Sequence, residues 1–245
     1  MQDGNSVMQD TATTPERLRA APQGAPPARR QSRSAAPAGW RFDLYPVEGE
    51  NLLQMKILSV NTGRARGLSI DGREVMTAIG KRGEGGPVEI GRLGLAGDEQ
   101  ADPSVHGGIA KAVYLYPCEH YPFWQTVRAQ AKAADWNEPL AMGACGENLT
   151  TEGLFEDRLF VGDRLVLPRC VLAVSEPRFP GFKFNAALGF KQAAKLMVQS
   201  GFCGAYLTVI EPGAVQAGET IELIPGPREV NIRDLFRARV RVSRA

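Results

Sequence analysis

The chain has 245 residues, of which 43% are hydrophobic and 23% charged, and its formal net charge is +2. This length and apolar content suffice for the core of one domain, with or without an extension. A charge so near neutrality disfavours a general nucleic-acid binder, and no apolar run approaches the roughly 20 residues of a membrane-spanning helix. The composition therefore predicts a globular protein with neither nucleic acid nor membrane among its partners.

The first 50 residues differ in composition from the rest of the chain. They are rich in Ala, Pro, Arg, Ser and Gly and show no apolar period. Such a segment cannot bury enough surface to offset the entropy of ordering. Order is expected to begin with a short strand, Met55–Asn61. Residues 1–54 are therefore either a disordered extension or the product of a misassigned start, with translation beginning at Met55; the sequence leaves both open.

From Met55 to about Pro227 the chain alternates between short candidate strands and turns rich in Gly, Asp and Pro. After the first strand, the pattern predicts strands at Val88–Ile90, Ala112–Tyr116, Arg164–Leu167, Val171–Val174, Ala205–Val209 and Thr220–Leu223. Two segments have helical spacing instead, one marked by Phe123, Val127 and Ala131 and one by Phe190, Ala193, Ala194 and Met197. We expect Pro122 in the first turn of the former.

Short strands at this spacing, with only two helices among them, indicate a closed or nearly closed β-barrel. We therefore predict a mainly β domain with a few peripheral helices over residues 55–227. Residues 228–245 are predicted to form a short helical tail, amphipathic around Asn231–Arg237.

The four cysteines indicate a reducing compartment. Cys118, Cys145, Cys170 and Cys203 form no CxxC pair and no zinc-finger spacing. We interpret them as reduced thiols, most of them small buried side chains, in a cytoplasmic protein.

The stretch "GDEQADPSVHGG", residues 97–108, suits a small anion. The amides of a Gly-Gly pair can approach an anion closely, and Lys111 just beyond them supplies a positive charge. His106 can donate or accept a proton near neutral pH. The simpler interpretation, a hydrogen-bonded turn histidine beside flexible glycines, stays open.

Two later stretches offer further polar groups. "GENLT", residues 146–150, contains the amide of Asn148, and "SEPRFPG", residues 175–181, presents Arg178 on a backbone stiffened by prolines. An arginine held in this way can bind a phosphate through two parallel hydrogen bonds. A chain-reversing turn and a surface arginine are the simpler alternatives.

Taken in order, the motifs resemble the MOSC family, the molybdenum cofactor sulfurase C-terminal domains, and within it the YiiM-like branch. The series reads GDEQAD, VHGG, KA, YP.EHY, GENLT, GDRL, S.PR.P and PG.VQAGE, between Met55 and about Phe236. The resemblance implies a MOSC-type β-barrel that binds molybdopterin, the organic part of the molybdenum cofactor. It further implies reduction of N-hydroxylated bases such as 6-hydroxylaminopurine. Pyridoxal phosphate binding is associated with the family at large.

The resemblance also implies roles for the candidate residues. His106 would act as the general acid near the reacting centre. The residues that would bind the cofactor are Gly107, Gly108, Lys111 and Arg178 for its phosphate and Asn148 for the edge of its pterin. Electrons would come from a separate flavin-type reductase, because the chain has no GxGxxG-type dinucleotide loop.

One position departs from the family pattern. The S.PR.P stretch normally continues with a cysteine whose thiolate binds molybdenum, and here the residue is Gly181. Cys203 is the candidate replacement ligand, with Cys145 as a second. Two functions therefore stay open: a molybdenum-dependent N-hydroxylamine reductase, and a non-catalytic protein that carries or binds molybdopterin or sulfur.

Overall fold

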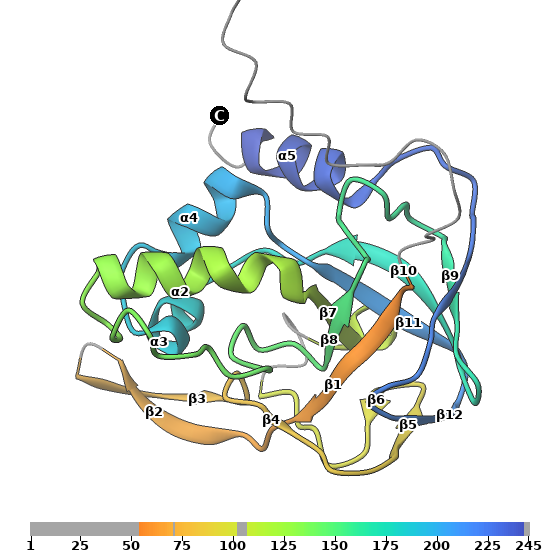
Figure 1. Ribbon diagram of the computed structural model, residues 1–245, viewed down its shortest axis with the longest axis horizontal. Coiled ribbons are helices and arrows are strands. Elements are labelled where there is room, and N and C mark those ends of the chain that lie inside the picture. Colours follow the sequence, from red (N-terminus) through yellow and green to blue (C-terminus); the bar gives the residue numbers. More distant parts are fainter. Residues whose placement is uncertain (1–53, 71, 102–106, 243–245) are drawn as a thin grey trace, which may run out of the picture. The chain divides into compact units, whose positions relative to one another are not determined.

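The computed structural model describes residues 54–70, 72–101 and 107–242. Within these ranges, strands joined by short helices make up most of the regular structure, which confirms the predicted mainly β class with a few helices (Figure 1). The described strands form three sheets, of eight, three and two strands. The expected extension, residues 1–53, and His106 lie outside the described residues.

The main sheet has the strand order β13-β9-β10-β11-β7-β8-β1-β4. In chain order these strands are β1 (Lys56–Thr62), β4 (Arg82–Gly83), β7 (Val113–Pro117), β8 (Leu149–Glu152), β9 (Arg164–Val166), β10 (Val171–Pro177), β11 (Ala205–Glu211) and β13 (Glu222–Ile224). All neighbours are antiparallel except β7 and β8. Because parallel strands start at the same edge of a sheet, the residues before β7 and those before β8 lie together.

The main sheet is not closed into a barrel, so the prediction of a closed barrel is wrong. Its end strands are β13 and β4. One isolated bridge, Lys56 with Thr220, and neighbouring backbone hydrogen bonds join the start of β1 to the residues just before β13, instead of a full ladder. The physical reason lies in the register. The antiparallel bridge places Glu222, the first residue of β13, opposite Gln54, the first described residue, so the rest of β13 has no described residue of this segment to pair with.

Two small sheets complete the β structure. One consists of β5 (Val88–Gly91), β6 (Gly94–Leu95) and β12 (Gly213–Val215), and the other is a hairpin of β2 (Arg66–Ile70) and β3 (Arg73–Thr77). The sequence analysis missed the hairpin, although Leu68 and Ile70 alternate with exposed residues and the Asp71-Gly72 pair between the two strands is a typical hairpin sequence.

The described helices cover parts of the main sheet. They are α2 (Tyr121–Gln130), α3 (Phe182–Leu188), α4 (Ala193–Ser200) and α5 (Ile232–Val242), with 3-10 turns η1 (Ile109–Lys111) and η2 (Cys118–His120). Pro122 lies in the first turn of α2, as predicted. None of the described helices is long and apolar enough to cross a membrane.

The core ties α2 and α3 to the central strand β7. Trp124 of α2 is fully buried, packs edge-on against Phe184 of α3 at 5.3 Å between ring centroids, and donates its indole N–H to the phenol of Tyr116. Burying a large aromatic side chain contributes more than the roughly 1.5–3 kcal/mol of a buried aliphatic one. The start of α3 is therefore held at a defined place beside β7, which positions the polar residues around it.

We predict that Gly204→Ala lowers the free energy of unfolding by about 2–4 kcal/mol, from positive-φ strain plus overpacking. Gly204 has φ +63, and an added Cβ would lie 2.4 Å from the carbonyl oxygen of Leu115. The backbone cannot easily move, since Ala205 pairs with Leu115 in the β11–β7 ladder. Gly218→Ala is the matched control, because φ is +90 there and the added Cβ meets no atom within 4 Å.

The control should lose only the strain, about 1–2 kcal/mol. Urea denaturation of both variants measures the two losses. Equal losses would show that the space around Gly204 is not the constraint.

Candidate functional site

A pocket of about 290 Å³ lies between the main sheet and the start of α3. Its size is near the lower end of the roughly 300–1,000 Å³ typical of small-molecule sites. Three residues singled out from the sequence, Lys111, Asn148 and Arg178, line it together with Gly181. Lys111 precedes β7 and Asn148 precedes β8, so the parallel pairing of these strands brings the two motifs to one edge of the sheet.

The remaining predicted residues are placed differently. His106 lies outside the described residues. Gly107 and Gly108 come just before η1, Gly108 has φ +87, and its N–H donates to Oε1 of Gln100 at 3.4 Å. Neither glycine belongs to the described lining of the pocket. The roles of these three residues stay predictions.

Arg178 brings a buried positive charge to the pocket. Its side chain is only 7% exposed, Nη1 donates to the carbonyl oxygen of Cys145 at 2.8 Å, and the guanidinium lies over the rings of Tyr114 (4.8 Å) and Phe184 (5.2 Å). Within the described part of the chain, no carboxylate forms an ion pair with Arg178. Arginine stays protonated in proteins, so the pocket holds a cation that lacks a protein counter-ion there.

The charges of the described lining are unequal. Four cationic side chains face two carboxylates, an excess of two positive charges: Lys81, Lys111, Arg178 and Lys183 against Asp98 and Glu99. Lys81 and Asp98 form a buried ion pair, while Lys111 lies 4.0 Å from Glu176 and its ammonium 5.9 Å from the ring centroid of Tyr206. Burial lowers the pKa of Lys81, and the charge of Asp98 acts in the opposite direction. The pocket is electrostatically suited to an anion.

Asn148 holds the wall of the pocket together. Its Oδ1 accepts from the backbone N–H of Tyr114 at 3.0 Å, and Nδ2 donates to the carbonyl of Asn61 at 3.2 Å and to Oδ2 of Asp98 at 2.8 Å. Both amide protons are therefore used, and one carbonyl lone pair is left for a ligand. The predicted contact of Asn148 with a pterin edge stays a prediction, limited to that one acceptor.

The described lining of the pocket contains no thiol. Gly181 has an extended backbone (φ −112) at the start of α3, and a Cβ there would meet no atom within 4 Å. Cys145 and Cys203 are fully buried, and burial raises the pKa of both thiols. Among the described residues, no group of three His, Cys, Asp or Glu side chains is placed to hold a metal. A ligand role for either cysteine stays a prediction without geometric support.

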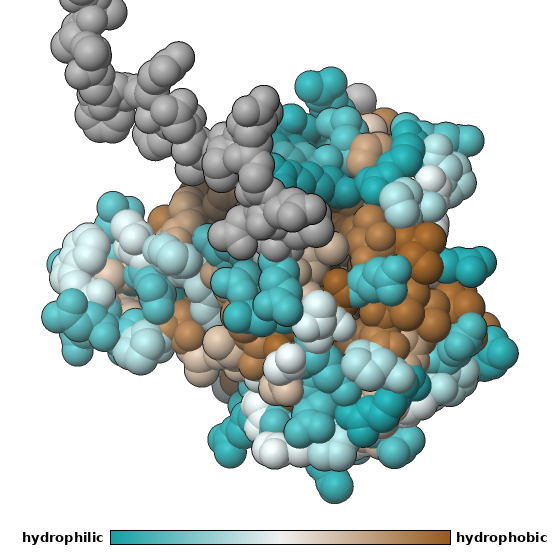
Figure 2. Space-filling model, turned by 45° about the vertical axis from the view of Figure 1, so that its right-hand side comes forward, coloured by the Kyte–Doolittle hydropathy of each residue, from teal (hydrophilic) through white to brown (hydrophobic). Residues whose placement is uncertain are grey.

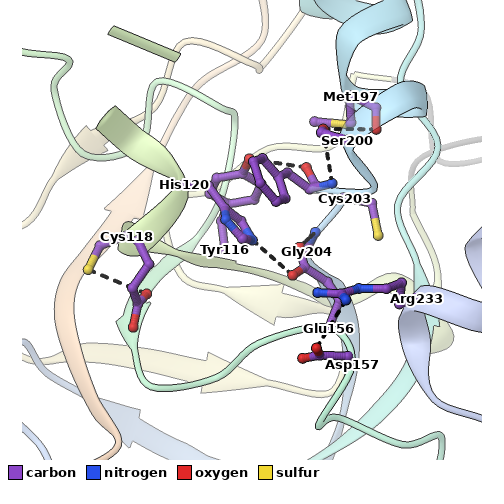
Figure 3. Close-up of polar contacts among 12 residues, drawn as sticks. Tyr116, Cys118, His120, Glu156, Asp157, Met197, Ser200, Cys203, Gly204 and Arg233 are labelled. Atoms are coloured by element: carbon purple, nitrogen blue, oxygen red, sulfur yellow. Dashed lines mark hydrogen bonds and ion pairs between the residues drawn. The ribbon is translucent and has the colours of Figure 1, made fainter. Parts of the chain in front are cut away.

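The second histidine belongs to a buried cluster outside the pocket (Figure 3). His120 Nε2 lies 2.8 Å from Oε2 of Glu156, and Oε1 of Glu156 accepts from the backbone N–H of Gly204 at 2.8 Å. The imidazole stacks on Phe202 at 3.9 Å between centroids. In Figure 3 the sulfur of Cys203 points away from His120. The pair thus joins η2, the loop before β9 and the residue before β11, and we assign it a structural role.

Glu147 is a second buried carboxyl, next to the pocket residues Gly146 and Asn148 in the chain. Oε1 accepts from the phenol of Tyr121, the hydroxyl of Thr150 and the N–H of Gly143. Its Oε2 has no hydrogen-bond partner among the described residues. Burial raises the pKa of Glu147, although the hydrogen bonds to Oε1 act in the opposite direction.

Sequence reasoning missed several residues of the pocket. Lys183 and Phe184 lie two and three residues after Gly181 in "GFKFN", so their closeness to the S.PR.P motif could have indicated that they belong to the site. Lys81, in the turn between β3 and β4, had no such signal, because its ion pair with Asp98 forms only through the fold.

Comparison with known proteins gives several matches in sequence. The profile of the MOSC domain family matches residues 102–222. Uncharacterized protein YflK of Bacillus subtilis (strain 168) is 39% identical over 168 residues, which cover 69% of this chain and 72% of that protein. Protein YiiM of Escherichia coli (strain K12) is 35% identical over 158 residues, covering 64% and 68%. A protein of Gibberella moniliformis (strain M3125 / FGSC 7600) named "Reductase" is 35% identical over 190 residues, covering 75% of this chain and 32% of that protein.

Solved structures agree with these matches. The crystal structure of YiiM from Geobacillus stearothermophilus superposes with a TM-score of 0.60 at 28% identity, covering 76% of this chain and 83% of that one. YiiM from Escherichia coli gives a TM-score of 0.52 at 26% identity, covering 75% of each chain.

We predict that Glu147 makes the protein less stable as the pH rises above the ordinary pKa of a glutamate, 4.5. Since folding raises this pKa, the folded state binds a proton that the unfolded state has released. The resulting stabilisation is complete below the ordinary pKa and is lost as the pH rises through the folded value. Glu147→Gln cannot ionise and should lack this decline.

The measurement is the free energy of unfolding of both proteins by urea from pH 4.5 to pH 8. The wild-type value minus the variant value should fall with pH. A difference that rises with pH would mean that Glu147 is ionised in the folded protein.

Proposed function

The chain belongs to the MOSC domain family, and from this membership we propose that it binds the molybdenum cofactor in the pocket beside Arg178 and reduces N-hydroxylated bases such as 6-hydroxylaminopurine. The observation that carries the proposal is the buried guanidinium of Arg178, which has no carboxylate partner among the described residues and lines the pocket. A buried cation of this kind is stabilised by an anionic ligand.

The residues of the pocket fit molybdopterin. Its terminal phosphate carries roughly two negative charges, which matches the excess of two cations in the described lining. Arg178 and Lys111 would hold the phosphate. Asn148 would accept one N–H from the pterin edge through its remaining lone pair.

The proposed reaction converts a hydroxylamino group into an amine and water, which consumes two electrons and two protons. The bound cofactor supplies the redox centre. His106 is the proposed general acid, and Lys81 is a second group on the pocket wall that could donate a proton, since burial lowers its pKa. A separate flavin-type reductase would supply the electrons. The fungal relative named "Reductase" supports reductive chemistry in this family.

A specific observation favours the alternative, a non-catalytic protein that binds or carries molybdopterin. The position that carries the metal-binding thiolate in the family is Gly181, and neither Cys145 nor Cys203 belongs to the described lining. Without a protein thiolate, the metal would be held by the sulfur atoms of the cofactor alone, and the protein would lose its direct means of tuning it.

We expect Lys111→Ala and Arg178→Lys to lower the pterin content of protein purified from a molybdenum-replete host. A charge-assisted hydrogen bond contributes about 1.5–3 kcal/mol, so each loss should weaken binding roughly tenfold or more. Arg178→Lys keeps the charge but loses the planar fork of donors. Lys195→Ala, an exposed lysine of α4 outside the pocket lining, is the control. Pterin content is read from fluorescence after oxidation, and melting temperatures verify folding. Unchanged pterin in both pocket variants would refute the phosphate assignment.

Restoring the thiolate separates the two candidate functions. We expect Gly181→Cys to fold normally, because φ is −112 and an added Cβ meets no atom within 4 Å. Its activity on 6-hydroxylaminopurine, with reduced methyl viologen as electron donor, should exceed that of the wild type. Gly181→Ser, with a hard oxygen in place of sulfur, is the matched control. Inactivity of the wild type and of Gly181→Cys despite full cofactor loading would reject the reductase and leave the carrier.

A further inference from the structure

Helix α5 carries a concentrated positive charge. Over Ile232–Val242 it has one carboxylate, Asp234, and four arginines: Arg233, Arg237, Arg239 and Arg241. The opposite side of the helix is apolar and packed: Ile232 and Phe236 are fully buried, and Phe236 stacks on Phe179 at 5.2 Å between ring centroids. The part of the molecule where Figure 1 places α5 is largely hydrophilic in Figure 2.

Contacts connect α5 with the rim of the pocket. Arg239 Nη1 lies 3.1 Å from Oε2 of Glu176, whose Oε1 lies 4.0 Å from Nζ of the pocket residue Lys111. Phe179, which stacks on Phe236, follows Arg178 in the chain. Helix α5 therefore contacts the rim of the pocket through Arg239 and Phe236.

Two of the four arginines are left for an external partner. Arg233 pairs with Asp157 at 3.0 Å, and Arg239 pairs with Glu176. Arg237 and Arg241 are exposed, and in the described part of the chain neither forms an ion pair. Exposed unpaired charges of one sign steer an oppositely charged partner and contribute little to folding.

The surroundings of α5 argue against other occupants. A helix that lies in a bilayer must offer its apolar side to lipid, and here Ile232 and Phe236 are already buried in the protein. A second copy related by a two-fold axis would place arginines against arginines. The overall charge of +2 lacks the basic excess of a nucleic-acid binder. An acidic protein is the partner that charge complementarity favours.

We propose that the exposed arginines of α5, Arg237 and Arg241, form the docking surface for an acidic flavoprotein that delivers electrons to the pocket. This inference rests on the proposed reductase function. In the overall reaction a reduced flavin gives up two electrons and two protons and becomes oxidised. The N–O bond of the hydroxylamine breaks, and N–H and O–H bonds form to give the amine and water. Docking at α5 places the donor on a helix that contacts the rim of the pocket.

The test uses an acidic flavodoxin, kept reduced by NADPH and its reductase, with the cofactor-loaded full chain. The variant Arg237→Gln/Arg241→Gln removes two charges from α5. Arg73→Gln/Arg92→Gln is the matched control, because it removes two exposed charges from β3 and from the turn between β5 and β6. The readouts are the affinity for oxidised flavodoxin by calorimetry, and the rate of 6-hydroxylaminopurine reduction with flavodoxin or with reduced methyl viologen.

We expect the α5 variant to bind flavodoxin about tenfold more weakly at low ionic strength and to lose a similar factor in the flavodoxin-driven rate. Its rate with methyl viologen, a donor small enough to need no docking, should stay within about twofold of wild type. The control should match wild type in all three measurements. Equal flavodoxin affinity of the two double variants, with methyl viologen activity intact, would overturn the docking surface alone. Inactivity of the loaded wild type with methyl viologen would overturn the proposed function, and this inference with it.

Discussion

A buried guanidinium without a neighbouring carboxylate is the constraint around which the pocket is organised. Removing a cation from water costs several kcal/mol unless other groups replace its hydration. For Arg178 these groups are the carbonyl of Cys145 and the faces of Tyr114 and Phe184, which come from the turn before β8, from β7 and from α3. Three separate elements must therefore meet before the charge is tolerated. These neutral groups offset only part of the cost of burying the Arg178 charge, and an anion bound in the pocket would offset the rest.

The frame around this charge is equally interdependent. Asn148 donates to Asp98 and to the backbone of β1 while accepting from β7, and Asp98 neutralises Lys81. Asp98 and Lys81, both of the described lining, thus neutralise each other, and the excess of two positive charges comes from Lys111, Arg178 and Lys183 against Glu99. Asn148 and Asp98 each bond to other residues of the pocket wall. Replacing either one would therefore disturb the structure of the wall in addition to any contact with a ligand.

Residues with a local pattern were predictable from the sequence, and residues that meet only through the fold were not. Strands β10 and β11 begin at Val171 and Ala205 as expected, because each contains a short apolar run that is buried in the core. The β2–β3 hairpin also had a local signal, the Asp71-Gly72 pair, which the sequence analysis missed. Lys111, Asn148 and Arg178 were found through motifs, and the structure brings them to one pocket. The Lys81–Asp98 ion pair and the hydrogen bonds of the Asn148 amide form between segments that are distant in the sequence, so no local sequence pattern predicts them. The number of predicted strands also did not show whether the sheet closes, because closure depends on the register between β1 and the residues before β13.

The pterin and molybdenum content of the wild-type protein tests the central claim most directly. The full chain would be purified from a molybdenum-replete host and denatured, its pterin oxidised and quantified by fluorescence, and its metal measured by mass spectrometry. The account predicts pterin and molybdenum in comparable amounts, both bound to folded protein and both released on denaturation. Folded protein that carries neither, and takes up neither when mixed with isolated cofactor, would contradict the assignment of the pocket.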